Sequence, residues 1–409
     1  MSGGGRKRPS TAVVTAAVRP DATPATATIL AAITRYARSL YRIRRGNALN
    51  VLVGGGLTFR AMLAAIDGAR RSICLETYIW EDDRMGTRFA DALMARARAG
   101  VTVRVIFDAI GGFGMSDAFV DKMMAAGVEV LEYHPIAPWR ARFNVSKRDH
   151  RKILVVDDEI GFTGGLNIAD EYAAKEDGGA GWHDVHCEVR GPVVADLARL
   201  FRSLWIREGG RPYPAPPRAE DVTAPPGDIA VRVVDNSKLR RRGAIRRAYV
   251  SAIRAARRAI LLENAYFLPD RRLRRALYRA VERGVEVSVI VPGRSDVKLI
   301  AYAGYYIYRK MVARGVRILR WQGPMMHAKT AVVDGIWSAI GSYNLDNRSL
   351  RYNLEVIVEV LDSDVGTVME GHFRRDVALT VPFDVAEWDR LRWWQKALAW
   401  FSFRIRNWL

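Results

Sequence analysis

The sequence predicts an α/β protein made of two pseudo-equivalent domains, each a mixed β-sheet flanked by helices, related by an internal repeat. Three observations support this. The chain has 409 residues, which is room for two or three domains. A segment rich in Pro and Gly, residues 208–230, divides it into halves of similar size. On both sides of this segment, short β-branched apolar runs alternate with helical patterns in the same order, as α/β units require.

The internal repeat is visible in three pairs of segments. Residues 70–78 (RRSICLETY) correspond to 257–266 (RRAILLENAY), residues 100–106 (GVTVRVI) to 284–290 (GVEVSVI), and residues 127–130 (GVEV) to 315–318 (GVRI). Because the order is the same in both halves, the two predicted sheets share one topology.

The apolar runs predict six strands in each half. In the first half they cover 72–80, 101–108, 128–133, 152–157, 160–165 and 185–190. In the second half they cover 259–267, 285–291, 316–321, 329–334, 337–342 and 355–361. Helical spacing of apolar residues predicts helices that include 59–66, 89–98 and 273–282.

Changes in composition along the chain predict six parts. They are a flexible tail (1–27), a basic amphipathic helix (28–46), the first α/β domain (47–207), a Pro/Gly-rich linker (208–230), the second α/β domain (231–385) and a Trp/Arg-rich amphipathic tail (386–409). The basic helix has two interpretations: it packs on the first domain, or it lies at an anionic membrane interface.

The charge balance predicts an anionic partner. Lys and Arg number 64 against 44 Asp and Glu, a net charge of +20, which suits nucleic acid, a phosphate ester or an acidic membrane surface. Arginines interrupt every apolar run, so no transmembrane segment is expected. Cys74 and Cys187 lie far apart in apolar contexts, and no disulfide framework is predicted.

The C-terminal tail concentrates tryptophan beside arginine. Five of the eleven tryptophans fall in the last 22 residues. Helical spacing predicts one apolar face made of Leu391, Trp394, Leu398, Phe401, Ile405 and Trp408. Trp beside Arg favours a membrane interface, and the alternative is a helix that closes the core of the second domain.

The most informative repeat is a motif with identical spacing in both halves. His150 and Lys152 precede Asp157, and six further residues lead to Gly164, Gly165 and Asn167. The second copy has His327, Lys329 and Asp334, followed after the same interval by Gly341, Ser342 and Asn344. On a strand, His and Lys two residues apart share a face, and a return strand brings the glycines and Asn back to them. Imidazole, ammonium and amide groups together suit a phosphodiester.

One copy supplies half of a catalytic site. Cleavage through a covalent intermediate needs an attacking group and a proton donor to the leaving oxygen, so two histidines facing each other would complete it. Each histidine should also be oriented by a carboxylate, and the repeat nominates the equivalent residues Asp184 and Glu355. Asp157 and Asp334 belong to the motif, although their position where the strand turns favours stabilisation of that turn.

Other polar residues carry weaker signals. Glu76 and Glu263 are repeated in strands, and they either reach the site or are buried carboxylates paired with arginines. The histidines without an equivalent in the other half are interpreted as incidental: His134, His183, His186 and His372.

These motifs resemble the phospholipase D superfamily, whose hallmark is a duplicated His-x-Lys-x4-Asp motif followed by Gly-Gly/Ser-x-Asn. The flanking segments GGLNIADEY (164–172), WHD (182–184), SYNLDNRS (342–349) and NLE (353–355) are similar to bacterial cardiolipin synthases. The resemblance covers about residues 47–390, and the N-terminus is more similar to a shorter subgroup without N-terminal transmembrane helices.

The resemblance implies phosphatidyl transfer between two phosphatidylglycerol molecules, with cardiolipin and glycerol as products and a phosphatidyl-histidine intermediate. It implies His150 as nucleophile, His327 as acid/base, and Lys152, Lys329, Asn167 and Asn344 as phosphate-binding residues. It requires no metal and no cofactor. The implied partner is an anionic phospholipid membrane surface, not nucleic acid, and the implied location is peripheral, on the cytoplasmic face of the bacterial cell membrane. One chain holds both motifs, so dimerisation is not demanded.

Two alternatives remain at this stage. A hydrolase of the same fold would release phosphatidic acid or cut nucleic acid, and the charge of +20 also suits a nuclease. A membrane-binding protein without activity is disfavoured by the intact His and Lys in both copies.

Overall fold

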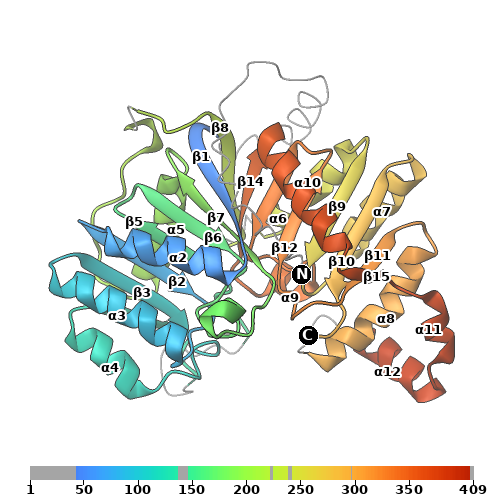
Figure 1. Cartoon of the computed structure of the whole chain (residues 1–409), viewed down its shortest axis with the longest axis horizontal. Coiled ribbons are helices and arrows are strands. Elements are labelled where there is room, and N and C mark those ends of the chain that lie inside the picture. The colour runs from blue at the N-terminus through green and yellow to red at the C-terminus, as the bar shows by residue number, and fades with distance from the viewer. Residues whose placement is uncertain (1–42, 137–145, 222–223, 238–241, 296, 406–409) are drawn as a thin grey trace, which may run out of the picture.

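The computed structural model describes residues 43–136, 146–221, 224–237, 242–295 and 297–405 (Figure 1). The predicted flexible tail 1–27 and residues 28–42 of the predicted basic helix lie outside this part of the chain. Residues 44–46 of that helix belong instead to strand β1 (Arg44–Val53), so the prediction is wrong there. The reason is tertiary: β1 pairs with strands of both halves, and Arg44 forms an ion pair with Asp196.

The described strands form one sheet of fifteen, in the order β15-β11-β10-β9-β12-β13-β14-β8-β1-β7-β6-β5-β2-β3-β4. The first half contributes β1, β2 (Ser72–Thr77), β3 (Thr102–Asp108), β4 (Glu129–Tyr133), β5 (Ile153–Val156), β6 (Ile160–Gly164) and β7 (Val185–Arg190). The second contributes β8 (Ile229–Asp235), β9 (Ala259–Asn264), β10 (Glu286–Pro292), β11 (Arg317–Trp321), β12 (Lys329–Val333), β13 (Trp337–Gly341), β14 (Val356–Leu361) and β15 (Thr380–Pro382).

Both halves have the same mixed topology. Strands β2, β3 and β4 are parallel, as are β9, β10 and β11, whereas β5, β6 and β7 run antiparallel, as do β12, β13 and β14. The α/β class with two pseudo-equivalent halves is therefore confirmed. The antiparallel pairing of β1 with β8 joins the two predicted sheets into one.

Helices cover both faces of the sheet (Figure 1). They are α2 (Gly55–Asp67), α3 (Arg84–Arg98), α4 (Asp117–Ala125), α5 (Val194–Arg207), α6 (Ala244–Ala255), α7 (Arg271–Glu282), α8 (Lys298–Val312), α9 (Asn347–Arg351), α10 (Ser363–Val377), α11 (Val385–Arg390) and α12 (Trp393–Arg404), with short 3-10 turns at Lys175–Asp177 and Ala219–Asp221.

The strands bury both faces, which explains their continuous apolar runs. Along β9, Ile260 and Leu262 pack with α6, α7 and α8, whereas the alternating Ala259 and Leu261 join the core beneath α5 and α10. The core beneath α5 and α10 includes residues of both halves. The halves are thus held together by a shared core as well as by the sheet.

The C-terminal helix α12 packs along α8 through a narrow side that contains Ala399 and Ser402. Among the residues that the structure describes, no helix is both long enough and apolar enough to span a bilayer. Cys74 and Cys187 are both buried and free.

Candidate active site

The two His-Lys motifs meet where the halves join. His150 and Lys152 lie directly before β5, and His327 and Lys329 lie at the start of β12. Backbone hydrogen bonds tie each histidine to the opposite half: the His150 N–H donates to Leu354 O at 3.0 Å, and the His327 N–H donates to His183 O at 2.7 Å. Both imidazoles are almost fully buried.

The predicted carboxylates lie within hydrogen-bond distance of the histidines, and each carboxylate comes from the half opposite to its histidine. Nδ1 of His150 lies 3.1 Å from Oε2 of Glu355, and Nδ1 of His327 lies 2.7 Å from Oδ2 of Asp184. Each carboxylate is fully buried and comes from the half that does not supply its histidine. Because the carboxylates take Nδ1, Nε2 is the ring atom left for chemistry.

A serine cluster that the sequence did not indicate holds Glu355. Its carboxylate accepts from Ser342 Oγ, from Ser349 Oγ at 2.8 Å and from Asn353 Nδ2 at 3.4 Å. The first half has Gly165 where the second has Ser342, and a Cβ at Gly165 would lie 2.1 Å from Oδ1 of Asp184. The first half therefore has Gly165 because Asp184 leaves no room for a side chain there, whereas the second half has Ser342, whose hydroxyl donates to Glu355.

The lysines bring two buried cations to one place. Lys152 Nζ donates to His150 O at 2.7 Å, and Lys329 Nζ donates to His327 O and lies 3.9 Å from Oδ2 of Asp184. Burial and the charge of Lys329 lower the pKa of Lys152 to about 7. An anion bound between the lysines would relieve this repulsion.

Burial favours the neutral form of both imidazoles when only protein groups surround them. Burial, followed by Lys329, lowers the pKa of His327 to about 4, even though Asp184 opposes the shift. Burial likewise lowers the pKa of His150 against the opposing effect of Glu355. Burial alone would raise the pKa of Asp184, but Lys329 and His327 outweigh it and the pKa falls, so this carboxylate stays ionised.

Aromatic rings line the site. The Tyr78 ring packs edge-on at 5.0 Å from His150, and the ring of its repeat counterpart, Tyr266, lies 6.4 Å from His327. The Tyr172 ring is 5.4 Å from His327, and its hydroxyl lies 3.4 Å from Nδ1 of that histidine. Tyr78 and Tyr266 occupy matching positions in the repeated segments, so the repeat could have indicated that both tyrosines lie near the site.

The two asparagines differ in their surroundings. Asn167 Nδ2 donates to Tyr172 Oη at 2.7 Å, and its Oδ1 accepts from the Ile79 N–H at 3.2 Å. Asn344 is buried, and its Oδ1 has no hydrogen-bond partner within the described part of the chain.

The structure does not bring Asp157 or Asp334 to the histidines. Each follows the far end of its strand, roughly 17 Å of extended chain from the lysine. Asp157 accepts from the N–H groups of residues 70–72 at 2.7 to 2.8 Å, and Asp334 accepts from those of residues 257–259 at 2.8 to 2.9 Å. Their inclusion among the catalytic residues is corrected: both stabilise turns, with φ of 55°.

The remaining repeated carboxylates form buried clusters behind the motifs. Glu76 pairs with Arg151 at 2.6 Å. Glu263 accepts from Thr330 Oγ1 at 3.0 Å and lies beside His183, whose Nε2 is 3.0 Å from Asp376 Oδ2. Among the described residues, His183, Glu263 and Asp376 are the group whose ligand atoms, all within 4.8 Å of one another, could hold a metal ion. His183 also accepts the His327 N–H through its carbonyl, so it has a structural role beside the site.

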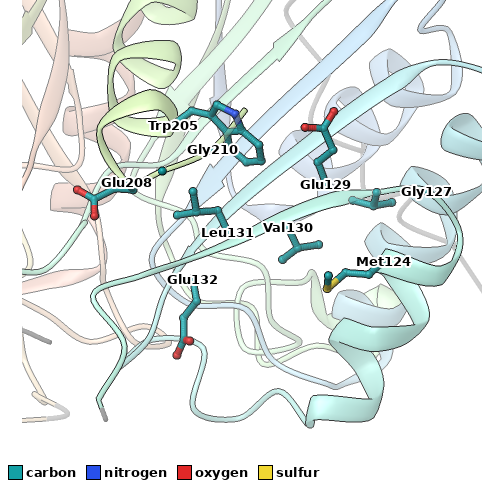
Figure 2. A pocket seen from close by; sticks show the side chains of 11 residues that line it. Met124, Gly127, Glu129, Val130, Leu131, Glu132, Trp205, Glu208 and Gly210 are labelled. Carbon is teal, nitrogen blue, oxygen red and sulfur yellow. The ribbon is translucent and has the colours of Figure 1, made fainter. Parts of the chain in front are cut away.

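A surface hollow of about 640 Å³ lies elsewhere, along β4 at one end of the sheet (Figure 2). Trp205 and Glu208 face it from the other side, and it contains no residue of the two motifs. It is therefore separate from the site of the two histidines.

Comparisons with known proteins show what the chain is similar to. The family model described as "Cardiolipin synthase, PLD-like domain" matches residues 62–205 and 249–377. Cardiolipin synthase A of Pseudomonas fluorescens is 35% identical over 333 residues, which are 81% of this chain and 69% of that protein. The cardiolipin synthase of Geobacillus thermodenitrificans is 32% identical over 345 residues, 83% of this chain and 68% of that protein.

Solved structures share the fold. The phosphatidylserine synthase of Haemophilus influenzae superposes with a TM-score of 0.70 at 15% identity, covering 92% of this chain and 100% of that one. The polyphosphate kinase of Porphyromonas gingivalis gives 0.56 at 17% identity, covering 83% of this chain and 49% of that one.

The duplicated fold and the paired motifs define an enzyme of the phospholipase D superfamily, a phosphatidyltransferase. Within that superfamily, the chain belongs to the cardiolipin synthase family.

Proposed function

We propose that this enzyme transfers a phosphatidyl group from one phosphatidylglycerol molecule to another, giving cardiolipin and glycerol. One observation carries the proposal: two buried histidines, one from each half, lie with Nδ1 beside a carboxylate of the opposite half, and each motif adds a buried lysine. This arrangement supplies a nucleophile and an acid/base in one site. The cardiolipin synthase relatives support the choice of reaction.

In the first step, Nε2 of His150 attacks the phosphorus of phosphatidylglycerol. The new P–N bond forms as the P–O bond to glycerol breaks, and the His327 imidazolium gives its proton to the departing glycerol oxygen. Lys152, Lys329, Asn167 and Asn344 hold the phosphate oxygens. Asn344 would donate to a phosphate oxygen through Nδ2, whereas its Oδ1, which has no partner in the described part of the chain, can accept only from a donor such as a headgroup hydroxyl.

In the second step, neutral His327 removes the proton from the terminal hydroxyl of another phosphatidylglycerol. That oxygen attacks the phosphorus, the P–N bond breaks, and His150 leaves as a neutral imidazole. The enzyme returns to its starting state without a net change in protons.

Two distances support His327 as the acid/base. Its 2.7 Å contact with Asp184 is shorter than the 3.1 Å contact of His150 with Glu355, whose carboxylate is shared with two serines. The closer carboxylate stabilises the imidazolium better. The protein groups alone set the pKa of His327 at about 4, and a bound phosphate anion would raise it by offsetting the charges of the lysines.

The proposed setting is peripheral, on the cytoplasmic face of the bacterial cell membrane. The net charge of +20 favours a surface that contains anionic phosphatidylglycerol.

Product analysis tests the function. Purified enzyme is incubated with phosphatidylglycerol vesicles, with and without EDTA, and lipids are identified by mass spectrometry. Cardiolipin and glycerol in equal amounts, unaffected by EDTA and lost in both His150→Ala and His327→Ala, are expected. Phosphatidic acid as the sole product would make the protein a hydrolase, and the absence of any lipid product would overturn the lipid substrate and turn attention to single-stranded DNA.

A further inference from the structure

Helix α12 turns its large apolar side chains away from the protein. Trp393 is 81% exposed, Trp400 51% and Phe401 52%. Exposed residues recur at 393, 394, 397, 400, 401 and 404, which is one face of a helix. The buried positions carry the small residues Ala399 and Ser402. A helix that only closed a core would have the opposite arrangement.

This face is held firmly in position. The Phe403 ring lies 4.9 Å from that of Tyr306 on α8, and the Trp388 ring lies 6.0 Å from the same tyrosine. The Arg309 guanidinium stacks 4.3 Å above Trp388. The exposed indoles therefore project from a docked helix, beside α8 at one end of the molecule (Figure 1).

Helix α12 lies near the edge of the sheet that is formed by the carboxyl ends of the parallel strands, which is also the edge where the site lies. Strands β9 and β10 are parallel, so their carboxyl ends share an edge. The chain leaves β9 through Tyr266, which packs near His327, and enters α7, whose Arg274 lies 5.8 Å from the Phe403 ring. The chain leaves β10 through Val297 and Leu299, each 37% exposed.

The first half presents an apolar side chain at the pseudo-equivalent place. The loop that follows β3 packs against the end of β2, because a Cβ at Gly111 would lie 1.9 Å from the carbonyl oxygen of Tyr78. Tyr78 contacts His150. Phe113, two residues beyond Gly111, is 84% exposed. Both halves thus expose apolar groups at the strand ends that lead to the histidines.

We propose that Phe113 in the first half, and Val297, Leu299 and the exposed face of α12 in the second, form one docking face for an anionic phospholipid bilayer. Indole rings favour the interface between headgroups and acyl chains. Arg392, Lys396 and Arg404 flank the indoles and complement anionic headgroups. The choice of a lipid as the bound partner rests on the proposed function. The exposure of these side chains is observed in the structure and does not depend on that function.

Flotation with vesicles tests the docking face. The probes are vesicles of phosphatidylcholine containing 30% phosphatidylglycerol and vesicles of phosphatidylcholine alone. The variants are Phe113→Ser and the double variant Trp393→Ser/Trp400→Ser. Met124→Ser is the matched control, since Met124 is 54% exposed at the end of α4 that faces away from this edge. Melting temperature confirms that each variant is folded.

We expect wild type and Met124→Ser to bind the anionic vesicles, the double variant to bind at least tenfold more weakly, and Phe113→Ser to bind several-fold more weakly. Transfer activity on short-chain phosphatidylglycerol below its critical micelle concentration should stay within twofold of wild type in every variant.

The proposal is overturned if the double variant binds the anionic vesicles as strongly as wild type does. Loss of a dimer in sedimentation of that variant also overturns it, since a second copy would then be the occupant. Vesicle binding without transfer activity would contradict the proposed function and leave the docking face standing.

Discussion

Each imidazole depends on a carboxylate from the opposite half, and this dependence makes the carboxylates informative positions for mutation. In the proposed mechanism, Asp184 keeps the His327 ring in one tautomer and stabilises its imidazolium through the 2.7 Å contact at Nδ1. Glu355 does the same for His150. The carboxylates lie behind the rings, on the side away from Nε2, so their removal should affect the rate more than substrate binding.

Asp184→Asn should lower kcat for transfer by roughly 10²- to 10³-fold, while KM changes by less than about threefold. The amide cannot stabilise the charged ring, although it keeps the shape of the side chain. Steady-state kinetics in mixed micelles of phosphatidylglycerol would measure both constants, with Glu355→Gln as the matched variant. An unchanged kcat in a folded Asp184→Asn protein would remove the positioning role.

Asp157 should behave in the opposite way. Asp157→Ala removes the acceptor of three backbone N–H groups at a turn, and we expect the free energy of unfolding to fall by roughly 1 to 2 kcal/mol. The kcat of the folded protein should stay within about twofold of wild type. Urea titration and steady-state kinetics on the same preparation would separate the two effects. A large loss of kcat at full stability would return Asp157 to the catalytic residues.

The residues of the motif could be predicted from the sequence, because the spacing is duplicated and the chemistry of His and Lys suits a phosphodiester. The repeat also identified Asp184 and Glu355 as equivalent. It could not tell which histidine each one serves, because that depends on how the halves face each other. The serines around Glu355 carried no repeated signal, since Ser342 stands where the first half has Gly165.

At the scale of elements, the segment 182–184 of the first half is the main contact with the His327 motif. His183 exchanges backbone hydrogen bonds with Met325 and His327, and its ring stacks on Trp321. Asp376 on α10 pairs with that ring, and Glu263 on β9 lies beside it. Three elements therefore meet at one buried polar cluster next to Asp184.

This cluster predicts a pH-dependent stability. Burial alone would lower the pKa of His183, but Asp376 raises it to about 9, and burial raises the pKa of Glu263 to about 8. Both groups hold a proton more tightly in the folded chain than in the unfolded one, so the stability that they contribute is lost as pH rises towards 8 to 9. The free energy of unfolding should fall between pH 6.5 and 9.

Urea titrations at pH 6.5 and 8.5 would measure this fall. His183→Gln removes one of the two groups, and the difference between the two pH values should become smaller than in wild type. His134→Gln is a suitable control, because His134 lies beside Glu208 in the first half and is not part of the cluster. If His183→Gln and wild type show the same pH dependence, the fall in the free energy of unfolding arises from groups outside this cluster.

Three strands and one helix face were not predicted from the sequence, each for a tertiary reason. The shortest of these strands, β15, has three residues and forms by pairing with β11 at the edge of the sheet. β1 lies partly within a predicted helix, and β8 begins inside a predicted linker, and both are specified by pairing across the junction of the halves. For α12, the helical pattern placed Trp394 and Phe401 with Leu398 and Ile405. The structure instead exposes Trp394 and Phe401 with Trp393 and Trp400, because the side with small residues packs on α8.

At the scale of the whole molecule, one sheet of fifteen strands and a shared core fix the two halves relative to each other. The shared sheet and core keep the partners of the hydrogen bonds across the junction in place, as the proposed mechanism requires. The predicted duplication therefore has a functional consequence: neither half holds a histidine together with its own carboxylate.

The net charge of +20 predicts a strong effect of salt on vesicle association. Raising KCl from 50 to 500 mM should weaken binding to vesicles with 30% phosphatidylglycerol by roughly tenfold or more, since screening removes the attraction of basic side chains to the surface. Turnover of monomeric short-chain substrate should change much less. Cosedimentation at both salt concentrations would measure the binding, and salt-independent binding would contradict an electrostatic contribution.

The central claim is that one histidine of each half serves a different step at one phosphorus. It is tested most directly by trapping the intermediate with a phosphatidyl ester of p-nitrophenol, whose leaving group needs no proton. With this donor, His327→Ala should still form the P–N bond and accumulate a phosphatidyl group, which peptide mass spectrometry would locate on His150, whereas His150→Ala should carry none. A phosphatidyl group on His327 in the His150→Ala protein would reverse the roles, and the absence of any covalent adduct in both variants would contradict the two-histidine account.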